Sequence, residues 1–453
     1  MNIIVVGFGK VGEAIVRQLA AEKHDITVVD IQQSLGANAE QLDVAFCAGN
    51  GGRADVLREA GCASADLLIA VTGVDELNIL VCSIGKMLGA HDTIARVRNP
   101  DYSSQINEIK KHVGIDMAIN PEMAATGEML RILRFPSAMT VDIFAKGAVE
   151  IVGHRLKEGS VLDSVPLCDL KKKYPAKVLL CAVERDGEVY IPTGNFVLKS
   201  GDRISVVAPR AEIEKFFKAT GTFNKRRIKS VMIVGGSRIG FYLSSELVRY
   251  GIDVTLIESD AKKCEELTEV LPKQVKLYHG DGSSSDVLNE YDIHGHDAFV
   301  ALTGMDEENM VLGMYAARQG TFNKVIAKVN RQTFLSMVKN TETETYVSPK
   351  LICANQIVQY VRAKHNSLGS NVETLHTLVD GKVEALEFIV KEGSACIGIP
   401  LKDLPIRSGM LVACITRKGT VMSPGGNDTI EAGDNVIIVT KKKGLNDLDD
   451  ILK

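Results

Sequence analysis

The chain carries the same sequence pattern twice, at a constant separation. The segment VVGFGKVG at 5–12 returns as IVGGSRIG at 233–240. The acidic residue that ends the next apolar run also returns, as Asp30 and then as Glu258, at the same distance along the chain as the glycine segment. Self-similarity of this extent indicates two copies of one folding unit, each of which must bury its own core.

The repetition extends past these motifs. AVTGVDELN at 70–78 matches ALTGMDEEN at 301–309 with a slightly larger separation, which indicates a longer intervening loop in the second copy. Pro121 and Pro349 lie as many residues apart as the two glycine segments do. Each begins a run whose apolar residues follow a helical period. We expect each of these helices to connect one unit to the segment that follows it.

A second kind of module is also repeated. GAVEIVGHRLKEGS at 147–160 matches GKVEALEFIVKEGS at 381–394. The pattern P-x-G-N-x-x-[IL]-x-x-G-D-x-[IV] begins at Pro192 and again at Pro424 with identical spacing. The chain is therefore predicted to alternate two N units with two C modules. The predicted boundaries are 1–135, 136–224, 225–365 and 366–453.

Composition narrows the class of protein. The chain has 453 residues, of which 45% are apolar, enough for several hydrophobic cores. The net charge is −4 with both signs interspersed, so we predict no nucleic-acid partner. The nine cysteines occur without a C-x-x-C pair, as expected for reduced cysteines in the cytoplasm. No apolar run approaches the roughly 18 residues of a membrane span.

The two kinds of module differ in how strand-like and helix-like segments follow one another. In the first N unit, short Val- and Ile-rich runs such as NIIVVG and DLLIAVT alternate with amphipathic runs such as KVGEAIVRQLAAE. This alternation predicts an α/β, Rossmann-like doubly wound domain with a parallel sheet covered on both faces. The C modules instead show short β-branched runs between Gly-Asp and Pro-Gly turns, which predicts small strand-rich α+β domains.

The first glycine-rich turn has the spacing of a dinucleotide site. Gly7 permits a tight turn after the strand, Gly9 lets the backbone approach a pyrophosphate, and Gly12 allows the helix to pack on the sheet. Phosphates would lie at the helix N-terminus, and Asp30 would accept hydrogen bonds from ribose hydroxyls, which favours NAD or adenosine nucleotides over NADP. The predicted site comprises Gly7, Phe8, Gly9, Lys10, Val11, Gly12 and Asp30.

The second unit departs from this pattern at one position. Gly235 and Gly240 keep the first and third glycines and Glu258 keeps the acid, but Ser237 replaces the middle glycine. Its side chain could displace a pyrophosphate, or its hydroxyl or Arg238 could bind a phosphate. Whether this second site binds a nucleotide, and which one, stays open.

Further candidates come from the ends of later strands. Open α/β sheets bind ligands at the carboxyl ends of their strands, so residues at those ends can face the crevice. They can equally be turn residues or surface charges. The candidates are Asn50 and Asp281 after the third strand, Thr72 and Thr303 after the fourth, and Arg98, Lys328 and Arg331 near the fifth.

Little in the sequence indicates catalysis. The nine histidines are dispersed, and the G-x-S-x-G, H-E-x-x-H and G-x-x-x-x-G-K-[ST] motifs are absent. We predict no metal site and a ligand-sensing protein rather than an enzyme. An NAD-dependent oxidoreductase with an unrecognised catalytic domain is the alternative.

The tandem order, the two glycine loops with their acids, the repeated TG-x-D-x-x-N segments and the doubled P-x-G-N…G-D module resemble the TrkA family of Trk system potassium uptake proteins. Members pair KTN/RCK_N with RCK_C domains. The resemblance covers the whole chain and extends the dinucleotide role to Gly7, Gly9, Gly12 and Asp30 and to Gly235, Gly240 and Glu258. Ser237 departs from it.

The resemblance also implies a function. It implies a cytoplasmic regulatory subunit, peripheral on the inner face of the membrane, that gates a TrkH- or TrkG-type potassium transporter. It implies NAD(H) as ligand and, in relatives, ATP or ADP, and a homotetrameric ring or dimer of dimers. A regulator of a different channel or antiporter is the alternative.

Overall fold

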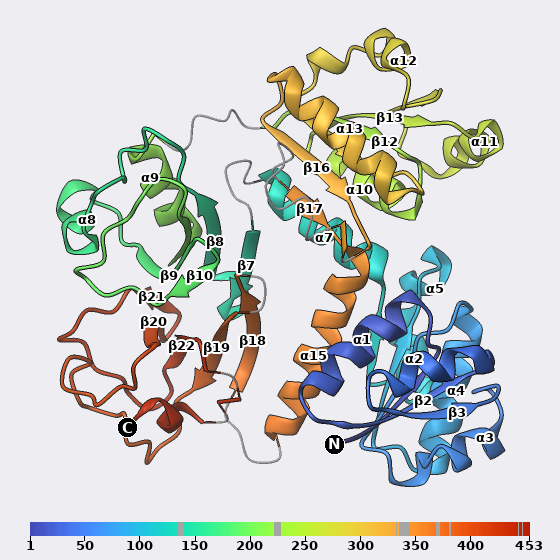
Figure 1. Ribbon diagram of the computed structural model, residues 1–453, viewed down its shortest axis with the longest axis horizontal. Helices are drawn as coiled ribbons and strands as arrows, with labels where there is room; N and C mark the ends of the chain where they lie inside the picture. The colour runs from blue at the N-terminus through green and yellow to red at the C-terminus, as the bar shows by residue number, and fades with distance from the viewer. Residues whose placement is uncertain are drawn as a thin grey trace.

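The chain forms two parallel-sheet domains and two antiparallel-sheet domains in strict alternation (Figure 1). The computed structural model describes residues 1–134, 140–221, 228–331, 333–334, 345–367, 372–379, 382–442, 444–445 and 447–453. The expected boundaries near 135 and 225 lie outside these residues. The expected boundary at 365 falls in the last turn of a helix.

The first N unit is a six-stranded parallel sheet with the order β3-β2-β1-β4-β5-β6. Its strands are β1 (Asn2–Val6), β2 (Asp25–Asp30), β3 (Ala45–Ala48), β4 (Leu67–Ala70), β5 (Asp92–Arg96) and β6 (Met117–Ile119). Its helices are α1 (Lys10–Ala21), α2 (Gly36–Glu40), α3 (Ala54–Glu59), α4 (Asp75–Leu88), α5 (Pro100–Ser104) and α6 (Ile106–Val113). The strand order reverses between β1 and β4, which opens the crevice where doubly wound folds bind ligands.

The second N unit repeats this topology in the order β14-β13-β12-β15-β16-β17. Its strands are β12 (Ser230–Val234), β13 (Asp253–Glu258), β14 (Val275–His279), β15 (Ala298–Ala301), β16 (Lys324–Lys328) and β17 (Thr345–Val347). Its helices include α10 (Arg238–Arg249), α11 (Ala261–Val270), α12 (Ser285–Glu290) and α13 (Asp306–Gln319). The predicted Rossmann-like duplication is confirmed.

The C modules are five-stranded antiparallel sheets with matching orders, β10-β9-β11-β8-β7 and β21-β20-β22-β19-β18. The first contains β7 (Thr140–Phe144), β8 (Val149–Arg155), α8 (Leu167–Lys173), β9 (Leu179–Arg185), β10 (Glu188–Tyr190), β11 (Arg203–Ala208) and α9 (Arg210–Ala219). The second contains β18 (Val372–Leu378), β19 (Val383–Ile389), β20 (Met410–Arg417), β21 (Thr420–Met422) and β22 (Asn435–Thr440). The predicted small α+β domains are confirmed.

The repeated Gly-Asp turn of the C modules anchors an arginine. Gly201 has a φ of 88°, a conformation that favours glycine, and places Asp202 at the start of β11 with its side chain fully buried. Both oxygens of Asp202 accept hydrogen bonds from Arg185, at 2.7 Å each. In the second module, Arg417 makes the same bidentate pair with Asp434, at 2.9 and 2.8 Å. The signature is therefore a structural one.

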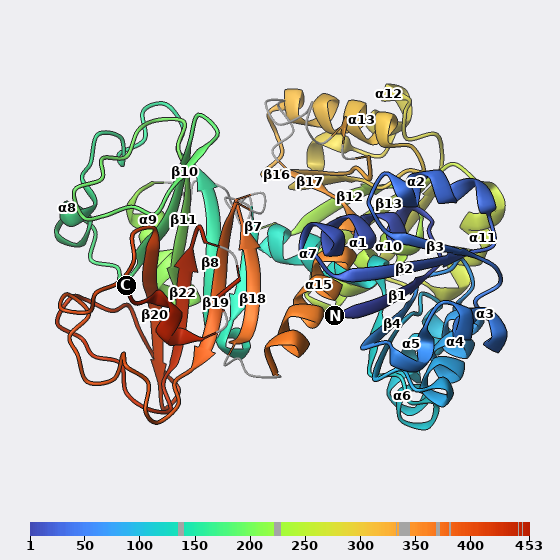
Figure 2. The same cartoon turned by 60° about the horizontal axis from the view of Figure 1, so that its bottom comes forward.

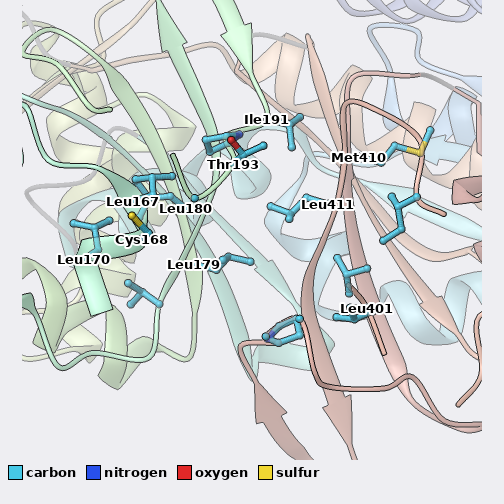
Figure 3. A pocket seen from close by; sticks show the side chains of 18 of the residues that line it. Leu167, Cys168, Leu170, Leu179, Leu180, Ile191, Thr193, Leu401, Met410 and Leu411 are labelled. Atoms are coloured by element: carbon cyan, nitrogen blue, oxygen red, sulfur yellow. The ribbon is translucent and has the colours of Figure 1, made fainter. Parts of the chain in front are cut away.

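The two C domains pack on each other within the chain (Figure 2). One apolar cluster joins residues of both sheets, including Phe144, Ile151, Leu378, Val383 and Ile437. A cavity of about 590 Å³ remains between the domains, bordered by Leu167 and Leu170 of the first and Leu401 and Leu411 of the second (Figure 3). The two sheets thus associate with each other inside one polypeptide.

The two connector helices are exchanged between the N units. Helix α7 (Pro121–Arg134) follows the first unit but packs on α10 of the second, and α15 (Pro349–Ser367) follows the second but packs on α1 of the first (Figure 1). Met129 of α7 is buried in the core of the second unit, and Ile357 of α15 is buried in the core of the first. Sequence order alone assigns each helix to the unit before it, whereas its apolar face belongs to the other one.

Two further observations concern the cysteines and the apolar helices. All nine cysteines are free, in agreement with their scattered positions. Within the described ranges, no helix has both the length and the apolar character needed to cross a membrane.

Asp202→Ala removes a buried carboxylate and leaves the Arg185 guanidinium without its counter-charge. We expect the free energy of unfolding of the first C domain to fall by roughly 3 kcal/mol, measured by urea denaturation of the full chain followed by circular dichroism. Asp169→Ala is the control, because that carboxylate is half-exposed and pairs with Lys172 at 3.5 Å. Equal midpoints for the two variants would contradict this structural role.

Candidate nucleotide-binding sites

The first glycine loop has two glycines that the fold requires and one that it does not. Gly7 has a φ of 99°, and a Cβ there would lie 2.8 Å from the backbone nitrogen of Thr72. A Cβ on Gly12 would collide with the carbonyl oxygen of Gly7. A Cβ on Gly9 would meet nothing within 4 Å, so the loop is open at this position. The open space lies at the N-terminus of α1, where free N–H groups favour an anion.

Asp30 lies directly beneath this loop at the end of β2. One carboxylate oxygen accepts a hydrogen bond from the Phe8 N–H at 2.7 Å, and the other accepts one from Gln32 N–H at 2.9 Å. Each oxygen keeps a lone pair for a further donor. The Phe8 side chain is buried in the core and Val11 packs against it, so these two residues offer only their backbone to a ligand. Lys10 is exposed at the first helical position.

The second loop is built in the same way around Gly235 and Gly240. Ser237 occupies the N-cap position of α10, and its hydroxyl accepts a long hydrogen bond of 3.5 Å from the Gly240 N–H. The first loop has no such side-chain cap, because Gly9 stands at the N-cap position of α1. Arg238 at the next position is exposed and makes no ion pair with the described residues.

Glu258 has more partners than Asp30. It accepts hydrogen bonds from the Gly236 N–H at 2.8 Å, the Asp260 N–H at 3.0 Å and the Lys263 ammonium at 2.7 Å. Burial acts to raise the pKa of this carboxyl, but the hydrogen bonds from Lys263 and from the backbone outweigh it and hold the pKa below its ordinary value. A ribose at this site would have to share the carboxylate with a lysine.

The candidates after the third strand serve as turn residues. Asn50 Oδ1 accepts a hydrogen bond from the Gly52 N–H at 2.9 Å. Asp281 Oδ1 accepts one from the Ser283 N–H at 2.9 Å and another from the Ser283 hydroxyl at 2.7 Å, and these bonds lower the pKa of Asp281. Both residues lie at the carboxyl end of the sheet, as expected, and the turn interpretation accounts for their contacts.

Thr72 and Thr303 are held by residues that sequence reasoning did not select. Asn78 is fully buried; it accepts hydrogen bonds from the N–H and the hydroxyl of Thr72, at 2.8 and 2.7 Å, and donates to the Arg96 carbonyl at 2.9 Å. Asn309 makes the matching bonds to Thr303 and Lys328. The repeated D-x-x-N spacing was the signal for this bridge between the fourth and fifth strands.

The structure aligns the cations near the fifth strands of the two units. Lys328 ends β16 and is the counterpart of Arg96, which ends β5. Asp75 accepts from the N–H of Arg98, and Asp306 accepts from the N–H of Asn330, so Asn330 is the counterpart of Arg98. Arg98, Lys328 and Arg331 all lie near the end of the fifth strand, but at positions that are not equivalent.

Arg98 and Arg331 are already paired. Arg98 donates to Glu122 at 2.7 Å, and Arg331 donates to Glu307 at 2.8 Å. Neither guanidinium is therefore a free anion ligand in the present arrangement, although an exposed pair such as Arg331 with Glu307 is weakly held.

Arg96 and Lys328 lie on the floors of the two sites, and each is about nine-tenths buried. Arg96 donates to the Thr72 carbonyl, and its Nε has no partner among the described residues. Lys328 donates to the Thr303 carbonyl at 2.6 Å. Burial lowers the pKa of both groups, because neither has a carboxylate in direct contact to offset the loss of hydration.

The architecture matches two family models, each in duplicate. Residues 3–121 and 231–349 match the TrkA-N domain, and residues 151–221 and 385–453 match the TrkA-C domain. The fold and the two glycine loops thus define the class of tandem proteins in which TrkA-N and TrkA-C domains alternate. Given its full-length relatives, the chain belongs to the TrkA family of Trk system potassium uptake proteins.

Relatives match over their full length. The chain is 30% identical to the Trk system potassium uptake protein TrkA homolog 1 of Methanosarcina mazei, covering 100% of both proteins. It is 32% identical to TrkA of Halomonas elongata, over 99% of this chain and 98% of that protein. The crystal structure of the GsuK RCK domain matches 97% of the chain and 92% of that structure with a TM-score of 0.63 at 16% identity, which shows the shared fold.

Gly12→Ala and Gly9→Ala should separate the structural glycine from the open one. We expect Gly12→Ala to lower the free energy of unfolding by about 1–3 kcal/mol, because the new methyl forces the helix away from Gly7. Gly9→Ala should leave stability within about 0.5 kcal/mol of the parent, because its methyl meets open space. Thermal unfolding measured by calorimetry would test this. The opposite ranking would contradict the described loop.

Proposed function

We propose that each N unit binds an adenine nucleotide at its glycine loop and that the chain is a nucleotide-responsive regulatory subunit of a Trk-type potassium transporter. One observation carries the proposal. A carboxylate at the end of the second strand lies beneath the N-terminus of the helix that follows the first strand in both units, and this N-terminus is open at Gly9 in the first unit and capped by Ser237 in the second. Donors suited to phosphates and an acceptor suited to a ribose diol therefore lie at the same edge of each sheet.

NAD(H) is the proposed ligand of the first site, with ATP or ADP as further candidates. Gly9 leaves room for a pyrophosphate, and Asp30 would repel a 2′-phosphate. A solved structure of the same fold is the GsuK channel bound to NAD, with a TM-score of 0.63. In the second site, Ser237 and the Lys263 ion pair leave less room and fewer free acceptors. We therefore propose weaker binding there.

The exchanged connector helices supply a route from ligand to partner. Each connector begins beside a nucleotide loop of the opposite unit and ends at the C domain of its own half. A ligand that binds more tightly to one arrangement of these helices shifts their equilibrium by its differential affinity, typically about 1–3 kcal/mol. We propose that a TrkH- or TrkG-like membrane subunit, contacted from the cytoplasmic face, receives this shift.

Asp30→Ala tests the proposed site and its role together. We expect weaker NADH binding in a calorimetric titration, because the ribose loses its acceptor, and altered rubidium uptake at low external potassium in cells lacking their own TrkA. Asp30→Asn is the matched variant, because it keeps an acceptor for the Phe8 N–H at reduced charge. Rescue of uptake by the parent chain is the positive control.

The outcomes separate the two parts of the proposal. Unchanged NADH affinity in Asp30→Ala would remove this residue from the site. Normal binding together with no rescue of uptake by the parent, when the cells carry a compatible membrane subunit, would argue against the transporter assignment. Steady NADH oxidation with a carbonyl substrate would instead favour an oxidoreductase.

Matching apolar residues are exposed on both units. Leu80 on α4 and Val311 on α13 occupy the same position in their helices, counted from the first residue, and are 50% and 61% exposed. Exposed apolar groups at equivalent positions of a duplicated chain fit association with a second copy. We propose that these faces contribute to the homo-oligomeric ring.

Leu80→Glu combined with Val311→Glu should reduce the mass of the assembly, because charge would be buried at the contact between copies. Light scattering after size-exclusion chromatography would measure it. Val270→Glu is the control, since Val270 is 60% exposed but lies on α11, away from these faces. An unchanged mass in the double variant would contradict the proposed ring contact.

A further inference from the structure

The two connector helices begin with residues of opposite charge at equivalent positions. Glu122 follows Pro121 in the first, and Lys350 follows Pro349 in the second. Because the helices are exchanged, Lys350 belongs to the second half of the chain but its helix packs on the first unit. The two nucleotide sites are therefore bordered by different chemistry.

The register of α15 on α1 places Lys350 beside the first glycine loop. Gln18 of α1 donates to Asn355 of α15 at 3.0 Å, and Arg362 donates to Glu22 at 2.9 Å. Both helices thus advance in the same direction. Five residues before the Gln18–Asn355 contact, the same register sets Lys350 beside Glu13, in the first turn of α1.

Lys350 has charged neighbours but no bound partner. Glu13 and Asp306 are the carboxylates whose charges act on it. Glu13 is paired with Arg17 at 2.9 Å, and Asp306 accepts two backbone N–H groups. Within the described part of the chain, the Lys350 ammonium makes no ion pair or hydrogen bond. It is half-buried, and burial lowers the pKa of its ammonium.

Arg96 adds a second cation to the same side of the first site. It is buried at the end of β5, has an unpartnered Nε among the described residues, and lies close enough to α15 to interact electrostatically with Cys353. The carboxylate of Glu122 acts electrostatically both on Arg96 and on Lys328, its counterpart in the second unit. The difference between the two sites is therefore in the connector that packs on each: α15 brings Lys350 to the first unit, whereas α7 carries Glu122 at the equivalent position.

We propose that Lys350, together with Arg96, strengthens the binding of phosphate-terminated nucleotides at the first site, alongside the proposed NAD(H), and that Lys350 binds the terminal phosphate across the boundary between the two halves. The ligand class is an adenosine di- or triphosphate. The inference rests on the proposed nucleotide binding and adds a specificity residue to it. Lysine acts on phosphate as a compact positive charge, so a group placed beyond the glycine loop discriminates by phosphate number.

The test is a series of ligands that differ in phosphate number. Adenosine, AMP, ADP, ATP and NAD are titrated calorimetrically into the full chain carrying Glu258→Ala, so that the first site dominates. Lys350→Gln is expected to weaken ATP by about tenfold, the loss of one charge-assisted contact, with little effect on adenosine or NAD. Lys350→Glu, which copies the charge of Glu122, should weaken ATP further. Lys218→Gln, an exposed lysine on α9, is the matched control.

The outcomes distinguish this inference from the proposed function. If Asp30→Ala with Glu258→Ala binds every nucleotide as well as the parent, the glycine loops are not the sites and the proposed function fails. If that double variant loses binding but Lys350→Gln binds ATP like the parent, the lysine makes no contact and only the further inference fails. An equal loss for adenosine and ATP would show a structural role and overturn the proposal as well.

Discussion

The burial of each connector helix against the opposite N unit is the interaction on which the rest of the structure depends. Ile357 of α15 completes the first core and Met129 of α7 completes the second, so neither parallel sheet has a finished hydrophobic core from its own half alone. Removing this packing would expose both cores at once. The exchange also sets each connector against the first helix of the opposite N unit and leads it into a C domain.

The two junctions between the halves differ in their side-chain contacts. Arg362 at the end of α15 bonds Glu22 of the first unit and, at 2.9 Å, Glu384 of the second C domain. At the equivalent place on α7, the Arg134 guanidinium lies 5.2 Å from the centre of the Tyr250 ring. The same position of the two connectors thus makes a partly buried ionic network in one junction and a cation–π contact in the other.

The glycine loops and the C-module signature could be predicted from sequence because they are local. Gly7, Gly12 and Asp30 act within a single strand-turn-helix unit, and their spacing carries the geometry. The match of Lys328 to Arg96 could not be found from one constant separation, because the two copies differ in length on both sides of the fifth strand: the second copy is longer before this strand and shorter between it and the connector. The sequence showed Asn78 and Asn309 only as a repeated residue type, and their role could not be predicted because their hydrogen bonds join two different strands.

The sequence by itself determined the duplication, the parallel-sheet class of the N units, the small C domains and the glycine loops, because periodic apolar runs and turn residues encode local conformation. Only the tertiary structure decided which unit buries each connector. It alone shows that Arg96 and Lys328 are the buried cations at the bottom of the two candidate sites, and that Lys350 borders the first of them. These features arise from packing between segments far apart in the chain. Which apolar faces pack together depends on their complementary shapes in the folded protein, and no local sequence pattern specifies it.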